Sequence, residues 1–407
     1  MRPYDGRRIL LGVSGGIASY KSAWLARLLA QAGAEVDVVL TRAASEFIGA
    51  LTFEALTGRP VHSDIFAPGH ALDHIRLPRE ANAIVIAPAT ADLMARAAHG
   101  HADDLLTACL LAAGDPHKSG TGVLFVPAMN DQMWSHPQTT ANAKRLREIG
   151  YVVLEPEEGM LAAGEGSGPG RMPEPETIFA HVGRLLEGRG ALALKRVVVT
   201  AGGTREAIDP VRFLSNRSSG KMGVAIAAAA WRRGAGVTLI SGPMEVDVPA
   251  GVSHVPVEST EQMAVEVRNH LSSADALIMA AAPADYTSAV KIDRKMKRTA
   301  SPLHLELAPT TDILRDTLSA RQNGAVIVGF ALETNDVLEE GRRKLSAKNL
   351  DLIVINDARE PGAGFGTDTN RVTLIGRDGS EESLPLMQKT DLADIILDRV
   401  EACFGAA

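Results

Sequence analysis

Little in this sequence of 407 residues could cross-link the chain, span a bilayer or stack on bases. Its two cysteines, Cys109 and Cys403, exclude a disulfide framework and suit a reducing compartment. Aromatic residues make up only 4% of the chain, which argues against a base-stacking surface. No uninterrupted apolar run reaches the roughly 18 residues that a membrane helix needs. The first residues, MRPYDGRR, lack the apolar core of a signal peptide, so we expect a cytoplasmic protein.

An excess of positive charge is also missing. The formal net charge of −7 gives no general attraction to nucleic acid or to an anionic membrane, so we expect small-molecule partners. The content of 45% apolar and 22% charged residues is ordinary for a globular protein. A chain of this length is expected to form two or three domains.

Short β-branched runs alternate with amphipathic helical stretches along the first half of the chain. The runs RRILLGVS, EVDVVLT, NAIVIAPA and VLFVPAMN predict strands of a parallel sheet built from βαβ units. The same rhythm restarts at KRVVVTAGG, residues 195–203. We therefore predict an α/β protein with two doubly wound, Rossmann-like domains, residues 1–190 and 191–407.

The segment GVSGGIASYK follows the first predicted strand and opens the first helix. Backbone N–H groups at such a turn bind anions, and Gly15 and Gly16 would let a phosphate approach closely. A nucleophile elbow with Ser14 is an alternative, although that motif belongs on a more central strand. A nicotinamide dinucleotide site would need G-x-G-x-x-G and an acidic residue near Thr41, and this sequence has neither. We favour a mononucleotide phosphate over these readings and over a turn without a ligand.

Two later strands end in similar Pro-Ala turns, in IVIAPATADL and VLFVPAMNDQMW. In an open α/β sheet, ligands lie at the carboxyl ends of the strands. We therefore expect Thr41, Thr90 and Asn130 to lie near Ser14. The alternative is that each proline only terminates its strand.

The histidines give weaker signals. His74 in LDHIRL is, on its own, an ordinary surface or hydrogen-bonded residue. The segment AHGHADD groups His99, His101, Asp103 and Asp104, but no third histidine or thiolate stands at ligand spacing. A solvated helix and loop is therefore favoured there over a metal site.

The segment VTAGGTREAIDPVRFLSNRSSGKMG is the densest signal in the second half. Ser218, Ser219 and Gly220 stand at a helix start, where backbone N–H groups bind anions. SSGKM resembles the end of a P-loop, but Ser215 and Met222 occupy positions that need Gly and Ser or Thr. We predict a phosphate site of another kind, with a merely capped helix as the alternative.

A basic arm follows the buried strand that ends at Asp285. A charged run is usually solvated, but a mobile lysine loop beside a phosphate site can close over developing charge. The arm contains Lys291, Arg294, Lys295, Lys297 and Arg298. Further on, a strand ends near Phe330, and a helix supplies Lys344 and Lys348.

Residues 159–172, GMLAAGEGSGPGRM, contain five glycines and little bulk. Glycine loses more entropy on ordering than any other residue, so such a run is rarely only a connector. It is either a flap that closes over a ligand or a disordered spacer.

These motifs together resemble one family. GVSGGIASYK, APATADL, PAMNDQMW, GPGRMPE, TREAIDPVRFLSNRSSGKMG and KNLDLIVIND resemble, in order, the bacterial bifunctional phosphopantothenoylcysteine decarboxylase/phosphopantothenate–cysteine ligase of coenzyme A synthesis. No single motif is decisive, but their order across nearly the whole chain is highly specific.

The resemblance implies that residues 1–190 form a flavodoxin-like, FMN-dependent decarboxylase of 4'-phosphopantothenoylcysteine. The turn Ser14–Gly16, with Thr41 and Thr90, would hold FMN, which serves as the electron sink that loss of CO₂ requires. His74 matches the catalytic histidine of the family, and Asn130 matches the residue that holds the substrate carboxylate. The glycine-rich run would be the flap over this substrate.

One residue departs from the family pattern. The family commonly has LACG where this chain has LAAG, so Ala163 replaces a cysteine that donates the last proton. Cys109 and Cys403 are not obvious replacements. An engineered substitution, a lineage using water or another acid, and a half that has lost turnover all remain open. The last option gives the alternative of a ligase with a flavin-binding but impaired or regulatory N-terminal domain.

For residues 191–407 the resemblance implies a ligase that joins 4'-phosphopantothenate to L-cysteine. CTP would activate the acid as an acyl-cytidylate, with Mg²⁺ neutralising the triphosphate. Arg212 and Asn216 match residues near phosphopantothenate and the acyl-cytidylate, and Lys295 matches a lysine that stabilises developing charge. Family members form decarboxylase trimers and ligase dimers, which implies a dodecameric homo-oligomer. The matching CTP contacts are Ala281, Asp285, Thr311, Asp312, Ile313, Leu314, Phe330, Lys344 and Lys348.

Overall fold

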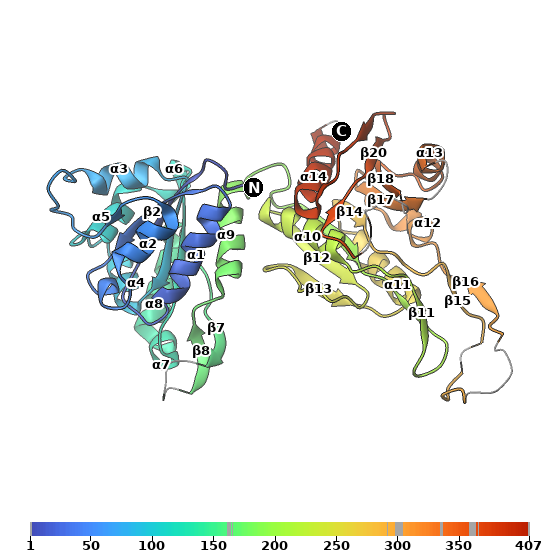
Figure 1. Cartoon of the computed structure of the whole chain (residues 1–407), viewed down its shortest axis with the longest axis horizontal. Helices are drawn as coiled ribbons and strands as arrows, with labels where there is room; N and C mark the ends of the chain where they lie inside the picture. The colour runs from blue at the N-terminus through green and yellow to red at the C-terminus, as the bar shows by residue number, and fades with distance from the viewer. Residues whose placement is uncertain are drawn as a thin grey trace. The chain divides into compact units, whose positions relative to one another are not determined.

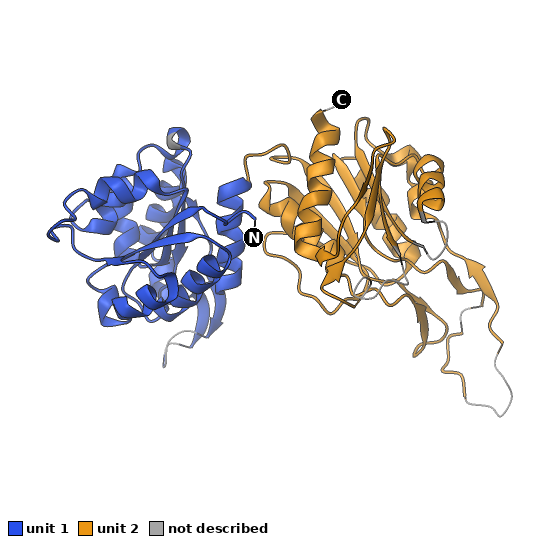
Figure 2. Ribbon diagram, turned by 45° about the horizontal axis from the view of Figure 1, so that its top comes forward, with its two compact units in different colours: residues 1–187 blue, residues 188–407 orange. Residues whose placement is uncertain are grey.

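The chain folds into two compact units, residues 1–187 (unit 1) and residues 188–407 (unit 2), shown in Figure 2. The predicted junction after residue 190 lies just beyond this division. The structure is a computed structural model. It describes residues 2–160, 164, 166–290, 292–297, 304–333, 337–357, 364 and 366–405. Ala163, Lys291 and Arg298 therefore lie outside the described residues.

Unit 1 is built on a six-stranded parallel sheet with the strand order β3-β2-β1-β4-β5-β6. The direction of winding reverses between β1 and β4, and ligands bind at such a switch point in doubly wound folds. β4 is buried along its whole length, as expected for a strand covered on both faces. The strands are β1 (Arg8–Val13), β2 (Glu35–Leu40), β3 (Val61–His62), β4 (Ala83–Ala89), β5 (Gly122–Pro127) and β6 (Val152–Val153).

Helices cover both faces of this sheet (Figure 1). On one face, Leu25 and Ile178 pack with Leu11 of β1, and on the other, Leu77 and Leu106 pack with Ile86 of β4. The first face carries α1 (Ser19–Gln31), α2 (Ala50–Thr57) and α9 (Pro175–Glu187). The second carries α3 (Asp73–Glu80), α4 (Ala91–Ala98), α5 (Leu105–Ala112) and α8 (Pro137–Ile149). Two short helices, α6 (Pro116–Ser119) and α7 (Asp131–Ser135), flank β5 in sequence.

Unit 2 contains an eight-stranded sheet with the order β13-β12-β9-β14-β17-β18-β20-β21. The first six strands are parallel, which confirms the second predicted sheet, whereas β20 and β21 are antiparallel. The sequence pattern did not predict this antiparallel edge. The strands are β9 (Arg196–Ala201), β12 (Gly236–Ser241), β13 (Ser253–Pro256), β14 (Ala276–Met279), β17 (Val326–Glu333), β18 (Leu352–Asp357), β20 (Thr373–Gly376) and β21 (Glu381–Ser383).

The remaining elements of unit 2 surround this sheet. Its helices are α10 (Lys221–Arg232), α11 (Thr260–Leu271), α12 (Ile313–Asp316), α13 (Val337–Ala347) and α14 (Lys389–Gly405). Small antiparallel pairs are formed by β10 (Arg205–Ala207) with β11 (Phe213–Ser215), β15 (Tyr286–Ser288) with β16 (Leu307–Pro309), and β19 (Thr369–Asn370) with β22 (Met387–Gln388). Within the described ranges of both units, no helix combines the length and apolarity needed to cross a bilayer.

Candidate active sites

Ser14 joins the ends of β1 and β4 at the switch point of unit 1. It is only 2% exposed. Its Oγ donates a hydrogen bond to the Pro88 carbonyl at 2.8 Å and accepts one from the Thr90 backbone N–H at 3.0 Å. Ser14 thus shapes the turn, and these two bonds leave its hydroxyl poorly placed to act as a nucleophile.

The glycines after Ser14 create a close-packed turn with an open face. A Cβ at Gly15 would lie 2.5 Å from the Cβ of Ala43, whereas a Cβ at Gly16 would meet nothing within 4 Å. Within the described part of the chain, no hydrogen bond satisfies the backbone N–H groups of these two glycines. Thr41 is buried, and its Oγ1 accepts the Ala44 N–H at 3.2 Å. The turn therefore offers backbone donors to an anion, as a flavin phosphate requires.

Lys21 is a residue of this region that the sequence reading missed. It lies in α1 and is 5% exposed. Its Nζ donates to the Met172 carbonyl at 2.6 Å and contacts the Glu174 carboxylate at 3.1 Å. Lys21 therefore fixes the chain just after the glycine-rich run. The sequence shows that Lys21 belongs to the GGIASYK motif, but it does not show that Met172 and Glu174 are its partners.

The described parts of the glycine-rich run form a hairpin, so the disordered-spacer reading is wrong for these residues. β7 (Glu157–Met160) pairs antiparallel with β8 (Ser167–Arg171). The Met129 N–H donates to the Gly170 carbonyl at 3.0 Å, and a Cβ at Gly170 would lie 2.2 Å from the Met129 carbonyl oxygen. The hairpin is therefore packed against the turn that carries Asn130, whose Oδ1 caps α7 by accepting the Gln132 N–H at 2.9 Å.

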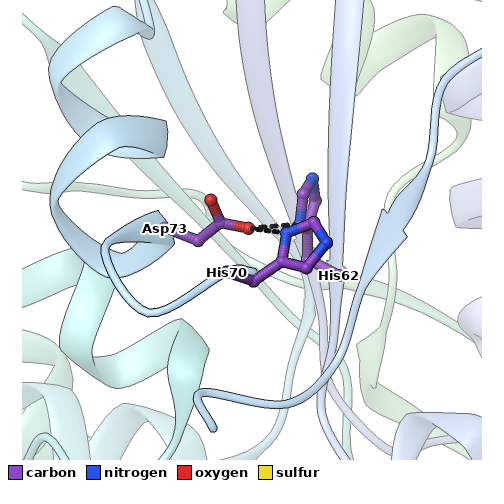
Figure 3. A group of neighbouring side chains, drawn as sticks. All are labelled: His62, His70 and Asp73. Atoms are coloured by element: carbon purple, nitrogen blue, oxygen red, sulfur yellow. Dashed lines mark hydrogen bonds and ion pairs between the residues drawn. The ribbon is translucent and has the colours of Figure 1, made fainter. Parts of the chain in front are cut away.

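His74 lies in the first turn of α3 and is half-buried. Its Nδ1 is buried without a hydrogen-bond partner in the described structure. The preceding residue, Asp73, contacts the Nδ1 atoms of His62 and His70, each at 2.8 Å (Figure 3). Burial raises the pKa of Asp73, but hydrogen bonds from Arg76 and His70 outweigh this and hold the pKa below its usual value.

The segment AHGHADD forms the expected helix and loop. Asp104 caps α5 by accepting the Thr107 N–H at 2.8 Å, and Arg96 contacts Asp104 at 2.7 Å and Asp103 at 3.2 Å. Cys109 lies in α5, where burial and then the charge of Asp73 raise the pKa of its thiol to about 12. Such a thiol is a poor proton donor, which agrees with the expectation that Cys109 does not replace a catalytic cysteine.

Unit 2 gathers most of its candidates around one cavity of about 490 Å³. The cavity lies at the carboxyl ends of β14, β17 and β18, as expected for an open α/β sheet. Its lining includes Asn216, Ala281, Asp285, Thr311, Asp312, Ile313, Leu314, Phe330, Lys344 and Lys348. In unit 1, a cavity of about 460 Å³ between α1 and the start of α9 contains none of the predicted residues.

Hydrogen bonds between distant segments shape this unit 2 cavity. Asn216 Nδ2 donates to the carbonyls of Ala282 at 3.2 Å and Pro283 at 3.0 Å, which holds the turn after β14. Asp312 caps α12 and also contacts Lys348 Nζ at 3.0 Å. The second contact places the turn before α12 beside Lys348, which directly follows α13.

Four lysines line the cavity: Lys221, Lys344, Lys348 and Lys389. Lys221 Nζ contacts the Asp368 carboxylate at 2.6 Å, and the buried Lys389 Nζ donates to the Thr367 carbonyl at 2.6 Å. Burial, and then the charge of Lys221, lower the pKa of Lys389. The sequence pattern did not identify Lys221 or Lys389 as site residues, because their neighbours come from distant segments. The four ammonium groups outnumber the two carboxylates that line the same cavity, Asp285 and Asp312, so the cavity favours a polyanion such as a triphosphate.

Asn356 adds an unsatisfied polar atom to the same cavity. Its Oδ1 is buried and has no hydrogen-bond partner in the described structure. A buried acceptor without a donor is costly, so a bound donor group would be favoured at this position.

Arg212 and Lys295 lie outside the residues that line the cavity. Arg212 contacts the buried Asp209 carboxylate at 3.0 Å and donates to the Met296 carbonyl at 3.3 Å. The Met296 N–H also donates to Asp209 at 3.2 Å. The described part of the basic arm, residues 292–297, is thus tethered to the turn that carries Arg212, and Lys295 is exposed beside it.

Comparisons with known proteins match both units. The family model for the flavoprotein domain matches residues 1–187, and the model for the DNA/pantothenate metabolism flavoprotein C-terminal domain matches residues 192–404. The coenzyme A biosynthesis bifunctional protein CoaBC of Bacillus subtilis is 45% identical over 98% of this chain and 97% of its own length. CoaBC of Mycobacterium tuberculosis is 47% identical over 97% of this chain and 96% of its own length.

One solved structure, the C-terminal domain of a coenzyme A biosynthesis bifunctional protein CoaBC, covers 53% of this chain and 99% of its own. It has 40% sequence identity and a TM-score of 0.46.

Proposed function

Because the chain belongs to the family of coenzyme A biosynthesis bifunctional proteins, we propose that it joins 4'-phosphopantothenate to L-cysteine and then decarboxylates the product to 4'-phosphopantetheine. Unit 2 is the phosphopantothenate–cysteine ligase, and unit 1 is the phosphopantothenoylcysteine decarboxylase. The observation that carries the ligase assignment is the cavity lined by four lysines at the carboxyl edge of the unit 2 sheet.

In unit 2, the carboxylate of phosphopantothenate attacks the α-phosphorus of CTP, which releases pyrophosphate and forms an acyl-cytidylate. The amine of cysteine then displaces CMP. Lys344 and Lys348 neutralise charge that develops on the leaving pyrophosphate. Asp285 lines the cavity, is exposed and offers a carboxylate oxygen of the kind that Mg²⁺ prefers.

Arg212 and Lys295 contribute from the tethered arm rather than from the cavity wall. Arg212 is held by Asp209 and Met296, so its guanidinium is positioned before substrate arrives. We assign it to the phosphate of phosphopantothenate, and Lys295 to the activation step.

In unit 1, FMN would be held by the Ser14–Gly16 turn together with Thr41 and Thr90. The open backbone N–H groups of that turn fit a phosphate. When bound, the flavin supplies two-electron oxidation and reduction. Asn130 holds the substrate carboxylate, and the β7–β8 hairpin excludes water above it. His74 exchanges a proton with the substrate, since its Nδ1 has no hydrogen-bond partner in the described part of the chain.

Because Ala163 stands where the family commonly has a cysteine, the decarboxylase activity needs a test of its own. The purified chain, incubated with phosphopantothenate, cysteine and CTP, is expected to release pyrophosphate and then CO₂. Pyrophosphate without CO₂ would instead support the alternative of a ligase with an impaired or regulatory flavin-binding domain. Colourless protein that consumes no CTP would contradict both halves of the proposal.

The substitution Ala163→Cys is expected to speed the final proton transfer to the decarboxylated product. Single-turnover measurements with phosphopantothenoylcysteine would resolve this step from CO₂ release. An unchanged rate would remove the proton-donor explanation. We also expect a cytoplasmic homo-oligomer built from decarboxylase trimers and ligase dimers. Light scattering would give the mass of this oligomer and hence its number of chains.

A further inference from the structure

Among the described residues, His62, His70 and Asp73 form one group that could hold a metal ion (Figure 3). His62 ends the edge strand β3, His70 lies in the loop that follows, and Asp73 begins α3. One ligand atom from each of the three residues lies within 4.8 Å of the other two. His62 and Asp73 are buried, whereas the His70 side chain is 47% exposed.

The donor set suits a borderline transition metal. Two imidazole nitrogens and one carboxylate oxygen are ligands of Zn²⁺ and Co²⁺, whereas Mg²⁺ prefers oxygen alone. Tetrahedral zinc sites have metal–ligand distances of about 2.0–2.2 Å, which separate the ligand atoms by about 3.4 Å. The two observed contacts at 2.8 Å therefore need to widen by well under an ångström.

The second oxygen of Asp73 is already held in place. Arg76 Nη2 and Nε donate to Asp73 Oδ1 at 2.9 and 3.2 Å, while both histidines face Oδ2. A partner on the far oxygen of a ligating carboxylate orients the near oxygen, as in metal sites generally. The cluster is therefore prearranged with one carboxylate oxygen and two nitrogens converging.

We propose that His62 Nδ1, His70 Nδ1 and Asp73 Oδ2 bind one zinc-class divalent ion, with a fourth position left to water on the exposed side of His70. Binding replaces the two contacts to Oδ2. In the bound state each imidazole carries its proton on Nε2 and presents the Nδ1 lone pair to the ion. The ion ties the loop between residues 62 and 73 to the start of α3, which carries His74.

The test is a titration of the full chain, free of any histidine tag and treated with chelator, with Co²⁺. Tetrahedral Co²⁺ gives a visible absorption band, and we expect it to saturate at one ion per chain and to disappear on addition of Zn²⁺. Mg²⁺ at the same concentration should leave the band unchanged. Absence of the band in the unaltered chain would overturn the proposal.

His70→Gln is the informative variant, because an exposed residue can be replaced without loss of the fold. Loss of groups that only orient a ligand lowers metal affinity about 10–100-fold, so loss of this ligand should lower it at least about 100-fold. The matched control is His101→Gln, which removes another exposed histidine of unit 1 and should bind Co²⁺ normally. Equal Co²⁺ affinity in His70→Gln and the unaltered chain would overturn the assignment.

A second measurement separates binding from folding. Zn²⁺ should raise the thermal unfolding midpoint of unit 1 in the unaltered chain and in His101→Gln, because a ligand that binds only the folded state stabilises it. The midpoint of His70→Gln should not respond to Zn²⁺. A response equal to that of the control would contradict the site.

Discussion

Unit 1 places its candidate residues along the ends of separate strands, whereas unit 2 gathers its candidates around one cavity. In unit 1 the hydroxyls of Ser14, Thr41 and Thr90 are hydrogen-bonded to the protein, which leaves backbone N–H groups to meet an anion. In unit 2 four ammonium groups line the cavity itself. Under the proposed function, the two similar sheets would bind phosphate by different means: unit 1 by close backbone geometry and unit 2 by charge.

If charge dominates in unit 2, removal of one cavity lysine should have the largest effect. Lys348→Ala is expected to lower the rate of pyrophosphate release by about 10²–10³-fold, the usual loss for one preorganised charge-stabilising group. Decarboxylation of supplied phosphopantothenoylcysteine should be unchanged. The control is Arg342→Ala, which removes an exposed cation from the middle of α13, the helix that ends just before Lys348. Arg342 pairs with Glu381 and does not line the cavity. A similar loss in both variants would show that the effect does not depend on charge inside the cavity, which contradicts the contrast drawn between the two units.

If geometry dominates in unit 1, a single methyl group at the hairpin should be damaging. Gly170→Ala would place a Cβ 2.2 Å from the Met129 carbonyl oxygen and displace the turn that carries Asn130. Misplacement by about 1 Å costs about 100-fold in rate, so we expect that loss in CO₂ release with ligation unchanged.

Gly166→Ala is the matched control in the same hairpin. Like Gly170 (φ +156°), Gly166 has a positive φ, +83°, but a Cβ there would meet nothing within 4 Å among the described residues. Backbone strain alone should cost about 1–3 kcal/mol in stability and leave most of the activity. Equal loss of CO₂ release in both variants would show that strain, rather than the contact with Met129, explains the effect.

Asn356 tests whether the unit 2 cavity also contains a neutral recognition group. Asn356→Leu removes a buried acceptor that has no partner among the described residues, so unfolding in urea should show unchanged or slightly higher stability. The KM for CTP or phosphopantothenate should rise about tenfold, as expected for one lost hydrogen bond of about 1.4 kcal/mol.

Asn370→Leu is the contrast within that cavity, since Asn370 Oδ1 already accepts the Arg371 N–H at 3.0 Å. This variant should lower stability by about 1–3 kcal/mol. If both variants lose stability equally and neither alters KM, Asn356 supports the fold and does not recognise CTP or phosphopantothenate.

The smallest expected difference is in acid sensitivity. Burial, and then the charge of Arg184, lower the pKa of His181 in α9 to about 4 from an ordinary 6.5. Between these values the unfolded chain binds the proton and the folded chain does not, so acid reduces the stability of unit 1. His181→Gln should flatten the fall of the unit 1 unfolding midpoint between pH 6.5 and 4. The unit 2 midpoint should follow the same pH course in both proteins.

Local sequence by itself determined many of the parallel strands and the glycine turn after β1. β-Branched runs predicted the parallel strands, and the glycines after β1 predicted the open turn at Gly16. Lys344 and Lys348 were predicted from family motifs, and both line the cavity. The strands and the turn depend on backbone preferences and periodicities that span only a few residues, which a single sequence displays directly. The two lysines, by contrast, were predicted only through the resemblance to a family.

Tertiary structure alone decided which distant side chains meet. Lys389 joins the cavity through carbonyls of another segment, and His62 reaches Asp73 across a loop. Among the described residues, Asn356 Oδ1 has no partner in the unit 2 cavity, which local sequence does not reveal. The order of strands in each sheet sets these contacts, and that order depends on packing over the whole unit rather than on any short stretch of residues.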